Sequence, residues 1–388
     1  MAALGLVAIV LASGQFKSAD PDSALHASLV ARLAGLPVSG WIAPRWWGQW
    51  DRTDLYREHP AGIFLLPAVL ARLGYPPEQA AYLVNAAYQV ITIVLIEALA
   101  LRLVSRREAR SLAWILQLLP VAFVYRIRAN HEQALLCCVL AALYGTERSR
   151  TKPAWIVLTV TAVVALLLVK GMLAFMALAM CVVWLVIRRS GDEAGATRRL
   201  WPVIGVLAAA ASALALTLIY DHVYRQVTGE PFVVPYVTQQ LGLASVQRST
   251  GVIGRKLANF LFYAGRVLWY ALPWSALLLA MLPSARKRML LAQPAGRQAM
   301  GLALALALAY VGLFSLSDRT ADRYIFPAYF FVGAAGAVAG LRGFSRLGRW
   351  VDKVQAAYPY EVVGVFVLTF LLAWLSAIVP LPRVRFRL

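Results

Sequence analysis

The sequence predicts an all-α protein that crosses a membrane many times. Its 388 residues are 61% hydrophobic and only 14% charged, and the mean hydropathy is +0.68. These values are typical of polytopic membrane proteins and not of soluble domains. Apolar segments of membrane length recur along the chain, and no polar stretch between them is long enough to build a core of its own. We therefore expect a single membrane-embedded domain over residues 1–388.

Basic residues outnumber acidic ones by 38 to 18, which gives a formal charge of +20. They recur in short clusters between apolar segments. Lys and Arg in the short loops of a membrane protein lie on the cytoplasmic side, whereas a nucleic-acid-binding protein gathers them in one patch. We therefore expect contact with membrane lipids and not with nucleic acid. The three cysteines lie within apolar segments, so neither a disulfide framework nor a zinc motif is predicted.

Eleven segments are candidate membrane spans, although several are shorter than the roughly 20 residues that a straight span needs. They are residues 1–15, 79–103, 111–126, 132–146, 154–170, 172–188, 200–220, 260–283, 299–316, 324–341 and 361–379. The first lacks a basic n-region, so we do not expect a cleaved signal peptide. Five short loops rich in Lys and Arg are predicted to be cytoplasmic. The outer face then receives two long loops, 15–78 and 221–259.

The first outer loop is predicted to contain two short helices that lie at the membrane interface. Asp22–Gly35 has apolar residues at near-helical spacing and follows Pro21. Ile63–Leu73 is apolar but too short to span. Tryptophans in this loop fit an interfacial aromatic belt, and the alternative is a platform that stacks against a sugar. They are Trp41, Trp46, Trp47 and Trp50.

Acidic residues gather in the first outer loop. Five of the 18 lie there, namely Asp20, Asp22, Asp51, Asp54 and Glu58. Where carboxylates are rare, a cluster beside a membrane indicates chemistry more than solvation. Asp20 and Asp22 bracket Pro21, so one can cap the next helix while the other faces the membrane surface. Glu58 and His59 open the second short helix, where capping is the alternative role.

Cationic residues mark the outer ends of several spans. Lys170 follows a fully apolar run, and Gly171 after it would let a ligand approach the backbone closely. The alternative for such a cation is a side chain that snorkels to the interface. A phosphate bound by cations, with a carboxylate base nearby, would need this division of charge. The candidate binding residues are His59, Arg126, Arg128, His131, Glu132, Lys170, Arg319, Arg323 and Tyr324.

The same residues leave a metal site open, and the sequence argues against a nucleotide site. A divalent ion could bind Asp20 with Asp22, or Glu58 with His59 and His131. No HExxH-type spacing occurs in the sequence, so a metal ion stays an open alternative. The sequence also has no GxxxxGK[ST] loop and no GxGxxG after a strand, which disfavours a cytoplasmic enzyme that uses a nucleotide sugar.

Six short motifs follow one another in order between about residues 15 and 330. They are Asp20-Pro21-Asp22, Glu58-His59-Pro60-Ala61, Arg128 to Glu132, Val169-Lys170-Gly171-Met172, Phe262-Tyr263 with Leu272-Pro273-Trp274-Ser275, and Ser317-Asp318-Arg319 with Tyr324-Ile325-Phe326-Pro327. This order resembles the C-type (GT-C) membrane glycosyltransferases, in the branch of the protein O-mannosyltransferases and the lipid A aminoarabinose transferase. The chain departs from that pattern in three places: its acidic motif is Asp20-Pro21-Asp22 where Asp-Glu is usual, Ala61 stands where a second Pro is usual, and Arg319 stands where Lys is usual.

The resemblance implies a glycosyltransferase that moves a sugar from a polyprenyl-phosphate donor to a lipid, glycan or protein acceptor. It implies a single inverting displacement without ATP, at the outer face of a bacterial inner membrane. Asp22 is then the first choice of base and Asp20 the second, with Glu58 orienting the acceptor or holding a metal. The cations expected to stabilise the leaving phosphate are Arg128, Lys170 and Arg319.

One alternative comes from another functional class, a transporter or flippase for a lipid-linked anion. Such a protein would use the same outer cations. Ionisable residues well inside the spans would favour it, and the sequence has few of them, mainly Glu97. We therefore expect an enzyme first and a transporter second.

Overall fold

The computed structural model is almost entirely helical. It describes residues 21–46, 54–126, 128–189, 196–244, 252–281, 294–317 and 320–353. Within these residues, the extended structure consists of one antiparallel bridge between Arg45 and Leu55. The all-α class predicted from the sequence is confirmed.

The helices divide between the two halves of the chain, and η denotes a 3-10 helix. The first half holds α2 (Pro21–Ala34), η1 (Val38–Ile42), α3 (Gly62–Arg72), α4 (Pro77–Ala100), α5 (Arg106–Ile115), η2 (Leu116–Leu118), α6 (Pro120–Arg126), α7 (Glu132–Ser149), η3 (Pro153–Trp155) and α8 (Ile156–Lys170). The second half holds α9 (Leu173–Arg189), α10 (Ala196–Thr228), α11 (Val233–Ala244), α12 (Val252–Tyr270), α13 (Trp274–Ala280), α15 (Pro294–Ser315), η4 (Asp322–Ile325) and α16 (Phe326–Gly343).

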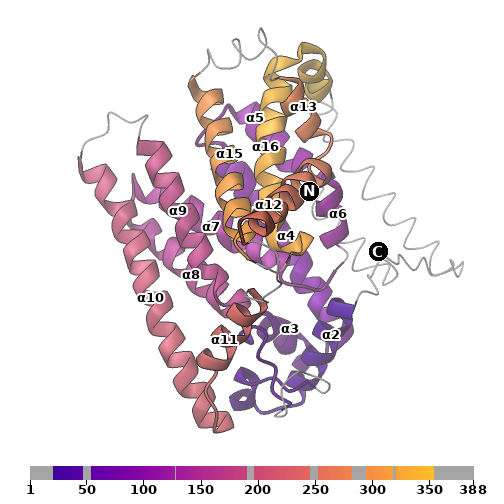
Figure 1. Cartoon of the computed structure of the whole chain (residues 1–388), viewed down its shortest axis with the longest axis vertical. Helices are drawn as coiled ribbons and strands as arrows, with labels where there is room; N and C mark the ends of the chain where they lie inside the picture. The colour runs from indigo at the N-terminus through magenta and orange to yellow at the C-terminus, as the bar shows by residue number, and fades with distance from the viewer. Residues whose placement is uncertain are drawn as a thin grey trace, which may run out of the picture.

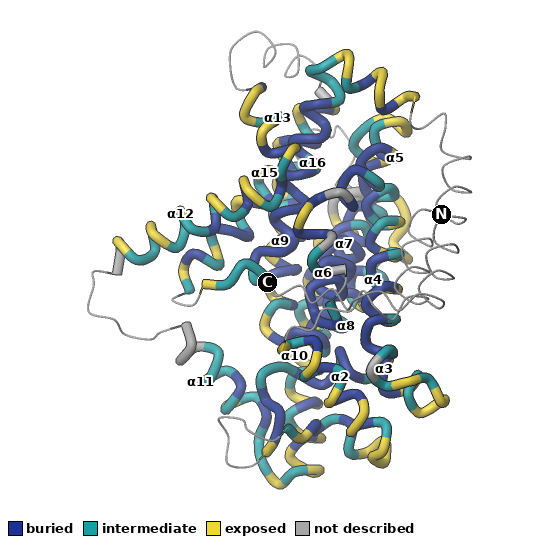
Figure 2. The backbone as a smooth tube through the Cα atoms, turned by 90° about the vertical axis from the view of Figure 1, so that its right-hand side faces the viewer, coloured by how far each residue is buried: buried dark blue, intermediate teal, exposed yellow. Residues whose placement is uncertain are grey.

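Five helical segments of the described chain are long and apolar enough to cross a membrane. They are Gln79–Ala100, Pro153–Lys170, Leu200–Thr228, Ala295–Ser315 and Asp322–Gly343. Only 28% of the segment in α10 is buried, so many of its apolar side chains face lipid, whereas 83% of the segment in α16 is buried and most of that helix is drawn in dark blue (Figure 2). The chain is thus an integral membrane protein with several spans. The number eleven stays a prediction, because residues 1–15 and 361–379 lie outside the described residues.

Glycine residues let α16 pack closely against its neighbours. A Cβ atom at Gly336 would lie 2.0 Å from the carbonyl oxygen of Trp274, and one at Gly333 would lie 3.0 Å from the side chain of Leu116. Only glycine permits such contact between helices, as in other tightly packed membrane helices. The backbones of α13 and α16 therefore touch, and a larger residue at Gly336 would push them apart.

Two predicted spans are not single helices. Residues 111–126 are divided among α5, η2 and α6, and residues 260–283 are divided between α12 and α13. One break in each span lies at a proline, Pro120 before α6 and Pro273 before α13, and proline lacks the N–H that a continuous helix would use. The second long loop, 221–259, is also mostly helical, because α10 continues to Thr228 and α11 follows.

Different helices form the two ends of the bundle. The short helices α2 and α3 lie with α11 at one end, and α5 and α13 lie at the other (Figure 1).

Away from α2, an ion pair joins α7 to α9, with 2.6 Å between Arg188 Nη2 and Glu147 Oε1. Trp184 Nε1 also donates to Glu147 at 2.9 Å, and Arg188 donates to Gln298 of α15 at 2.9 Å. This buried polar network holds three helices together.

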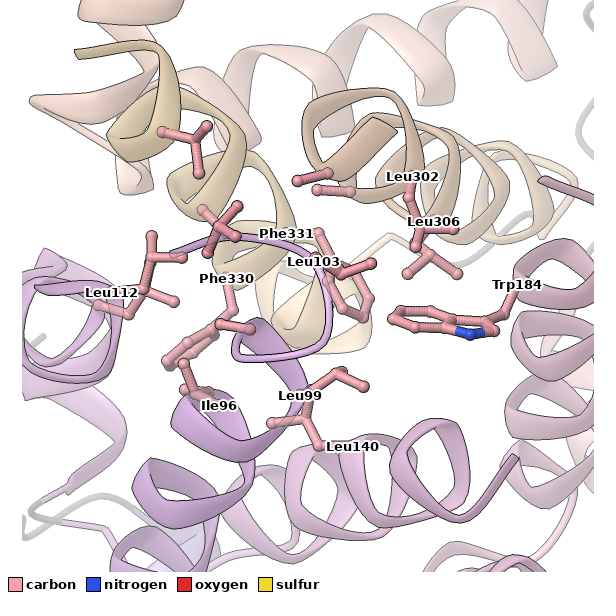
Figure 3. Close-up of a pocket in the computed structure, with 17 residues that line it drawn as sticks. Ile96, Leu99, Leu103, Leu112, Leu140, Trp184, Leu302, Leu306, Phe330 and Phe331 are labelled. Carbon is pink, nitrogen blue, oxygen red and sulfur yellow. The ribbon is translucent and has the colours of Figure 1, made fainter. Parts of the chain in front are cut away.

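An apolar cavity of about 80 Å³ lies in the core between α4, α7, α9, α15 and α16 (Figure 3). All 17 residues that line it are apolar, and the indole of Trp184 forms one of its walls. A cavity without polar partners stays dry and does not hold ions. It is therefore unsuited to a phosphate, and the chemistry must be sought elsewhere.

Candidate functional site

A second cavity, of about 330 Å³, lies between α2 and α11 on one side and the end of α15 and η4 on the other. Its walls come from α2, the chain before α3, the α8–α9 turn, α11, the end of α15 and η4. Polar and charged side chains reach it from segments far apart in the sequence. Six of the predicted site residues line it, namely Asp22, Glu58, His59, Lys170, Arg323 and Tyr324.

Asp22 lies in the first turn of α2, where the helix dipole favours a carboxylate. Its carboxylate forms an ion pair with the guanidinium of Arg323 on η4, and the two side chains are 40% and 30% exposed. The neighbouring Asp322 fixes η4, because it accepts from Arg266 at 3.1 Å and from the hydroxyl of Tyr270 at 3.2 Å. Arg323 is thus presented to the cavity by an anchored turn.

Lys170 is the last residue of α8 and is only 8% exposed, although it lines the cavity. A lysine that reaches for the bulk interface would be more exposed. After it the chain turns at Gly171, which has φ +59°. The expected approach of a ligand to Gly171 is wrong, because the Tyr236 hydroxyl fills that space and would lie 2.2 Å from a Cβ atom there. The hydroxyl accepts from Met172 N–H at 3.0 Å and so fixes this wall.

The alternative capping role of Glu58 and His59 is wrong. The residue that precedes α3 is Ala61, and no side chain caps the helix there. Its N–H instead donates to the hydroxyl of Tyr220 on α10, at 3.1 Å. Glu58 and His59 therefore lie before the helix with their side chains along the cavity wall.

Three of the four histidines of the chain are in edge-to-face contact, and one of them, His59, lines the cavity. The ring of His131 lies 4.5 Å from that of His26 and 4.7 Å from that of His59, between ring centroids. Burial, then the charge of Lys170 and the two other histidines, holds the pKa of His131 well below its ordinary value. His131 is therefore neutral near pH 7.

The metal sites considered from the sequence find no support among the described residues. No three His, Cys, Asp or Glu side chains in that part of the chain are grouped closely enough to bind an ion. Glu58, His59 and His131 are thus not arranged as ligands, and the pair of Asp20 and Asp22 is not tested because Asp20 lies outside the described residues. A residue set that would hold a metal cofactor is not evident there.

Like His131, two further predicted residues are not among those that line the cavity. The guanidinium of Arg128 lies over the ring of Tyr125, 5.1 Å from its centroid, and its carbonyl accepts from Asn85 at 2.6 Å. Glu132 is 3% exposed in the first turn of α7. The remaining predicted residues, Asp20 and Arg319, lie outside the described residues, as does the side chain of Arg126.

Four more residues line the cavity, and of these the sequence indicated a binding role only for the tryptophan, as one of a possible sugar-stacking group. They are Trp46, Tyr236, Gln239 and Gln240. Burial raises the pKa of Tyr236 to about 12, so its phenol acts as a neutral hydrogen-bonding group. The only sequence signal for the two glutamines was a polar pair inside the apolar stretch Val233–Ala244.

In sequence, residues 58–220 match the family described as dolichyl-phosphate-mannose-protein mannosyltransferase. The matched segment includes Glu58, His59 and Lys170 of the cavity, whereas Asp22 and Arg323 lie outside it. Among curated proteins, none matches the chain.

Three solved structures share the fold. ArnT from Cupriavidus metallidurans bound to undecaprenyl phosphate has a TM-score of 0.65 at 20% identity, over 87% of this chain and 59% of that one. The same enzyme in the apo state gives 0.66 at 20% identity, over 94% and 62%. The archaeal oligosaccharyltransferase AglB from Archaeoglobus fulgidus, in complex with an inhibitory peptide and a dolichol-phosphate, gives 0.51 at 12% identity, over 95% and 55%. The chain thus spans about three fifths of the length of these proteins, and the predicted GT-C resemblance is confirmed.

Proposed function

We propose that the protein transfers a sugar from a polyprenyl-phosphate donor to a hydroxyl of a lipid, glycan or protein acceptor. The observation that carries the proposal is the cavity in which Asp22 and Glu58 occur together with Lys170 and Arg323. A carboxylate can accept the proton of an alcohol, and cations can bind a phosphate. ArnT, which has the same fold, was solved with undecaprenyl phosphate bound, and this supports a lipid phosphate as the ligand.

The reaction is a single inverting displacement. The carboxylate of Asp22 takes the acceptor proton while the acceptor oxygen forms a bond to the anomeric carbon. The bond between that carbon and the phosphate oxygen breaks, and its electron pair leaves with the phosphate. Lys170 and Arg323 stabilise the negative charge that grows there, an effect of the kind worth about 10²–10³-fold when one donor is removed. Asp20 remains the second candidate for the base.

The remaining residues have supporting roles in this scheme. Glu58 orients the acceptor, and Tyr324 and His59 complete the polar wall. Arg319 is close in sequence to Arg323, and both are proposed to bind the phosphate. Arg128 does not line the cavity, so its effect on the phosphate is proposed to be indirect, through the residues that it contacts. We place the cavity at the outer face of a bacterial inner membrane, because the Lys- and Arg-rich loops are expected to be cytoplasmic.

The test is transfer by the purified protein in detergent. The probes are undecaprenyl-phosphate hexose and undecaprenyl-phosphate pentose with an envelope extract as acceptor, and mass spectrometry follows the release of undecaprenyl phosphate. The wild type should release it, and Asp22→Asn should lower the rate by about 10²–10⁴-fold, the contribution of a general base. Asp54→Asn is the matched control, because Asp54 lies in the same loop, is exposed and already has the positive φ that Asn tolerates.

The transporter alternative predicts a different result. In vesicles it would move the intact glycolipid between leaflets without cleaving it. Movement without release of undecaprenyl phosphate, in wild type and in Asp22→Asn alike, would replace the glycosyltransferase proposal.

A further inference from the structure

We propose that the cavity has a separate subsite for the sugar ring of the donor, formed by Trp46, Gln239 and Gln240. We call these three residues the sugar wall. The inference rests on the proposed glycosyl transfer and goes further, because it names the residues that distinguish the loaded donor from the bare lipid phosphate. The phosphate itself belongs to Lys170 and Arg323.

The first observation is how α11 faces the cavity. Tyr236, Gln239 and Gln240 are three and four residues apart, so they share one face of the helix. All three line the cavity, while most other residues of α11 are apolar. A carboxamide both donates and accepts hydrogen bonds, which suits sugar hydroxyls. Uncharged amides would not compete with the cations for the phosphate.

The second observation is that α11 is held in place. The carboxylate of Asp221 accepts from the N–H groups of Phe232 and Val233, each at 2.7 Å, at the start of the helix. The Gln240 amide donates to the carbonyl of Glu58 at 3.1 Å and so ties α11 to the chain before α3. Groups that are fixed before a ligand arrives lose little entropy when it binds. The wall is therefore preorganised.

The third observation concerns Trp46. Its backbone N–H donates to the carbonyl of Asp54 at 2.8 Å, and Tyr56 N–H donates to the carbonyl of Pro44 at 2.8 Å. These two bonds close the loop and hold the partly buried indole at the cavity. An indole has a broad apolar face and a polar edge, which suits the C–H face of a sugar ring. The stacking role considered from the sequence is thus assigned to Trp46.

The volume of the cavity suits a ligand with one sugar ring. Pockets for drug-sized ligands measure about 300–1,000 Å³, and this cavity, at about 330 Å³, is at the lower end. This volume is sufficient for a phosphate and one sugar ring. We therefore assign the subsite to a monosaccharide headgroup. Loss of these contacts after transfer would also weaken the hold on the spent carrier and help its release.

The experiment compares the affinity of the full-length protein in detergent for bare undecaprenyl phosphate with its affinity for undecaprenyl phosphate that carries a hexose, a pentose or an N-acetylhexosamine. In the wild type, at least one glycosylated lipid should bind tenfold or more tightly than the bare lipid. Gln239→Ala and Trp46→Ala should reduce that ratio to about one without changing the affinity for bare lipid. Trp46→Phe should keep part of the ratio, because a flat ring remains.

The controls are Gln226→Ala and Trp350→Ala, which change an exposed Gln on α10 and an exposed Trp far from the cavity. Both should keep the wild-type ratio. Equal affinity of the wild type for all the lipids would overturn the sugar wall and leave the phosphate site intact. Variants that weaken bare and glycosylated lipids equally would also overturn it. Failure of the wild type to bind bare undecaprenyl phosphate would remove the proposed function and the subsite together.

Discussion

Asp22 and Arg323 form an ion pair that joins the start of α2 to η4 in the wall of the cavity. This contact gives Arg323 two possible anionic partners, the Asp22 carboxylate and an incoming phosphate. In the proposed transfer, the acceptor proton neutralises the carboxylate while the phosphate gains charge. In this scheme the ion pair between Asp22 and Arg323 weakens while the negative charge on the leaving phosphate increases.

The ion pair predicts opposite effects of its two partners on lipid phosphate binding. Asp22→Asn should raise the affinity for bare undecaprenyl phosphate several-fold, because it removes a competing anion. Arg323→Gln should lower it, and in the Arg323→Gln background the gain from Asp22→Asn should shrink, since contacting residues do not act additively. Titration of wild type, both single variants and the double variant measures this coupling. Independent effects would show that Arg323 does not exchange partners.

Lys170 should contribute directly to donor binding. Lys170→Ala is expected to weaken undecaprenyl phosphate binding at least tenfold, about 1.4 kcal/mol, through loss of a charge-assisted bond. Lys170→Arg need not restore it, because a planar fork and a compact ammonium present different geometries. Lys152→Ala, at an exposed lysine before η3, is the control. A snorkelling lysine would instead give unchanged binding in the Ala and Arg variants.

Gly171 is predicted to be irreplaceable for two separable reasons. Gly171→Ala places a side chain at positive φ and 2.2 Å from the Tyr236 hydroxyl. Gly229→Ala is the matched control, because Gly229 has φ +78° but no atom within 4 Å of the new Cβ. The control should lose about 1 kcal/mol or somewhat more from backbone strain, and Gly171→Ala clearly more. Thermal unfolding in detergent measures both, and equal losses would mean that Tyr236 yields without cost.

His131 should make the folded protein sensitive to mild acid. An imidazole in the unfolded chain takes up a proton below about pH 6.5, whereas buried His131 stays neutral to a lower pH. The unfolded state then binds more protons, so stability should fall as the pH drops below about 6.5. His131→Phe keeps an aromatic ring in contact with His26 and His59 but cannot take up a proton, so it should flatten the dependence of Tm on pH. His222→Phe, at an exposed site, should leave the dependence unchanged, and a dependence that survives in His131→Phe would assign it to other groups.

Membrane orientation can be tested with single introduced cysteines. The three native cysteines are buried, so their background labelling should be low. Ser28→Cys on α2 and Thr151→Cys before η3 are both exposed and lie on the predicted outer and cytoplasmic sides. An impermeant thiol reagent added to intact cells should label only Ser28→Cys. Labelling of Thr151→Cys alone would invert the topology.

The short helices of the first loop are predictable from sequence to within one residue at each end. The expected Asp22–Gly35 and Ile63–Leu73 are Pro21–Ala34 and Gly62–Arg72. Apolar spacing and flanking Pro or Gly determine such elements locally. The breaks at Pro120 and Pro273 were not predicted, because the apolar composition of each segment indicated one continuous span. A single proline nevertheless has the larger effect on the backbone, since it lacks the N–H that a continuous helix uses.

Some residues of the candidate site were likewise predictable from the sequence, and others were not. Lys170 and Arg323 were predictable because a cation at an apolar helix end is expensive without a role. Arg128 carries the same signal, but its guanidinium is engaged by Tyr125, a contact visible only after folding. Gln239 has no local signal that separates it from a surface polar residue. Its exposure to the cavity depends on how Asp221 anchors α11, which is long-range packing.

The ion pair of Glu147 and Arg188 has a consequence for how the gene can vary. Removing one partner of a buried pair strands the other charge and typically costs about 3–5 kcal/mol, whereas replacing both with apolar residues is often neutral. The side chains are 3% and 14% exposed, so a change at either position alone is unfavourable, and a joint change must also give Trp184 and Gln298 new partners. In descent, the two positions should therefore behave as one character, gained and lost in a single linked step.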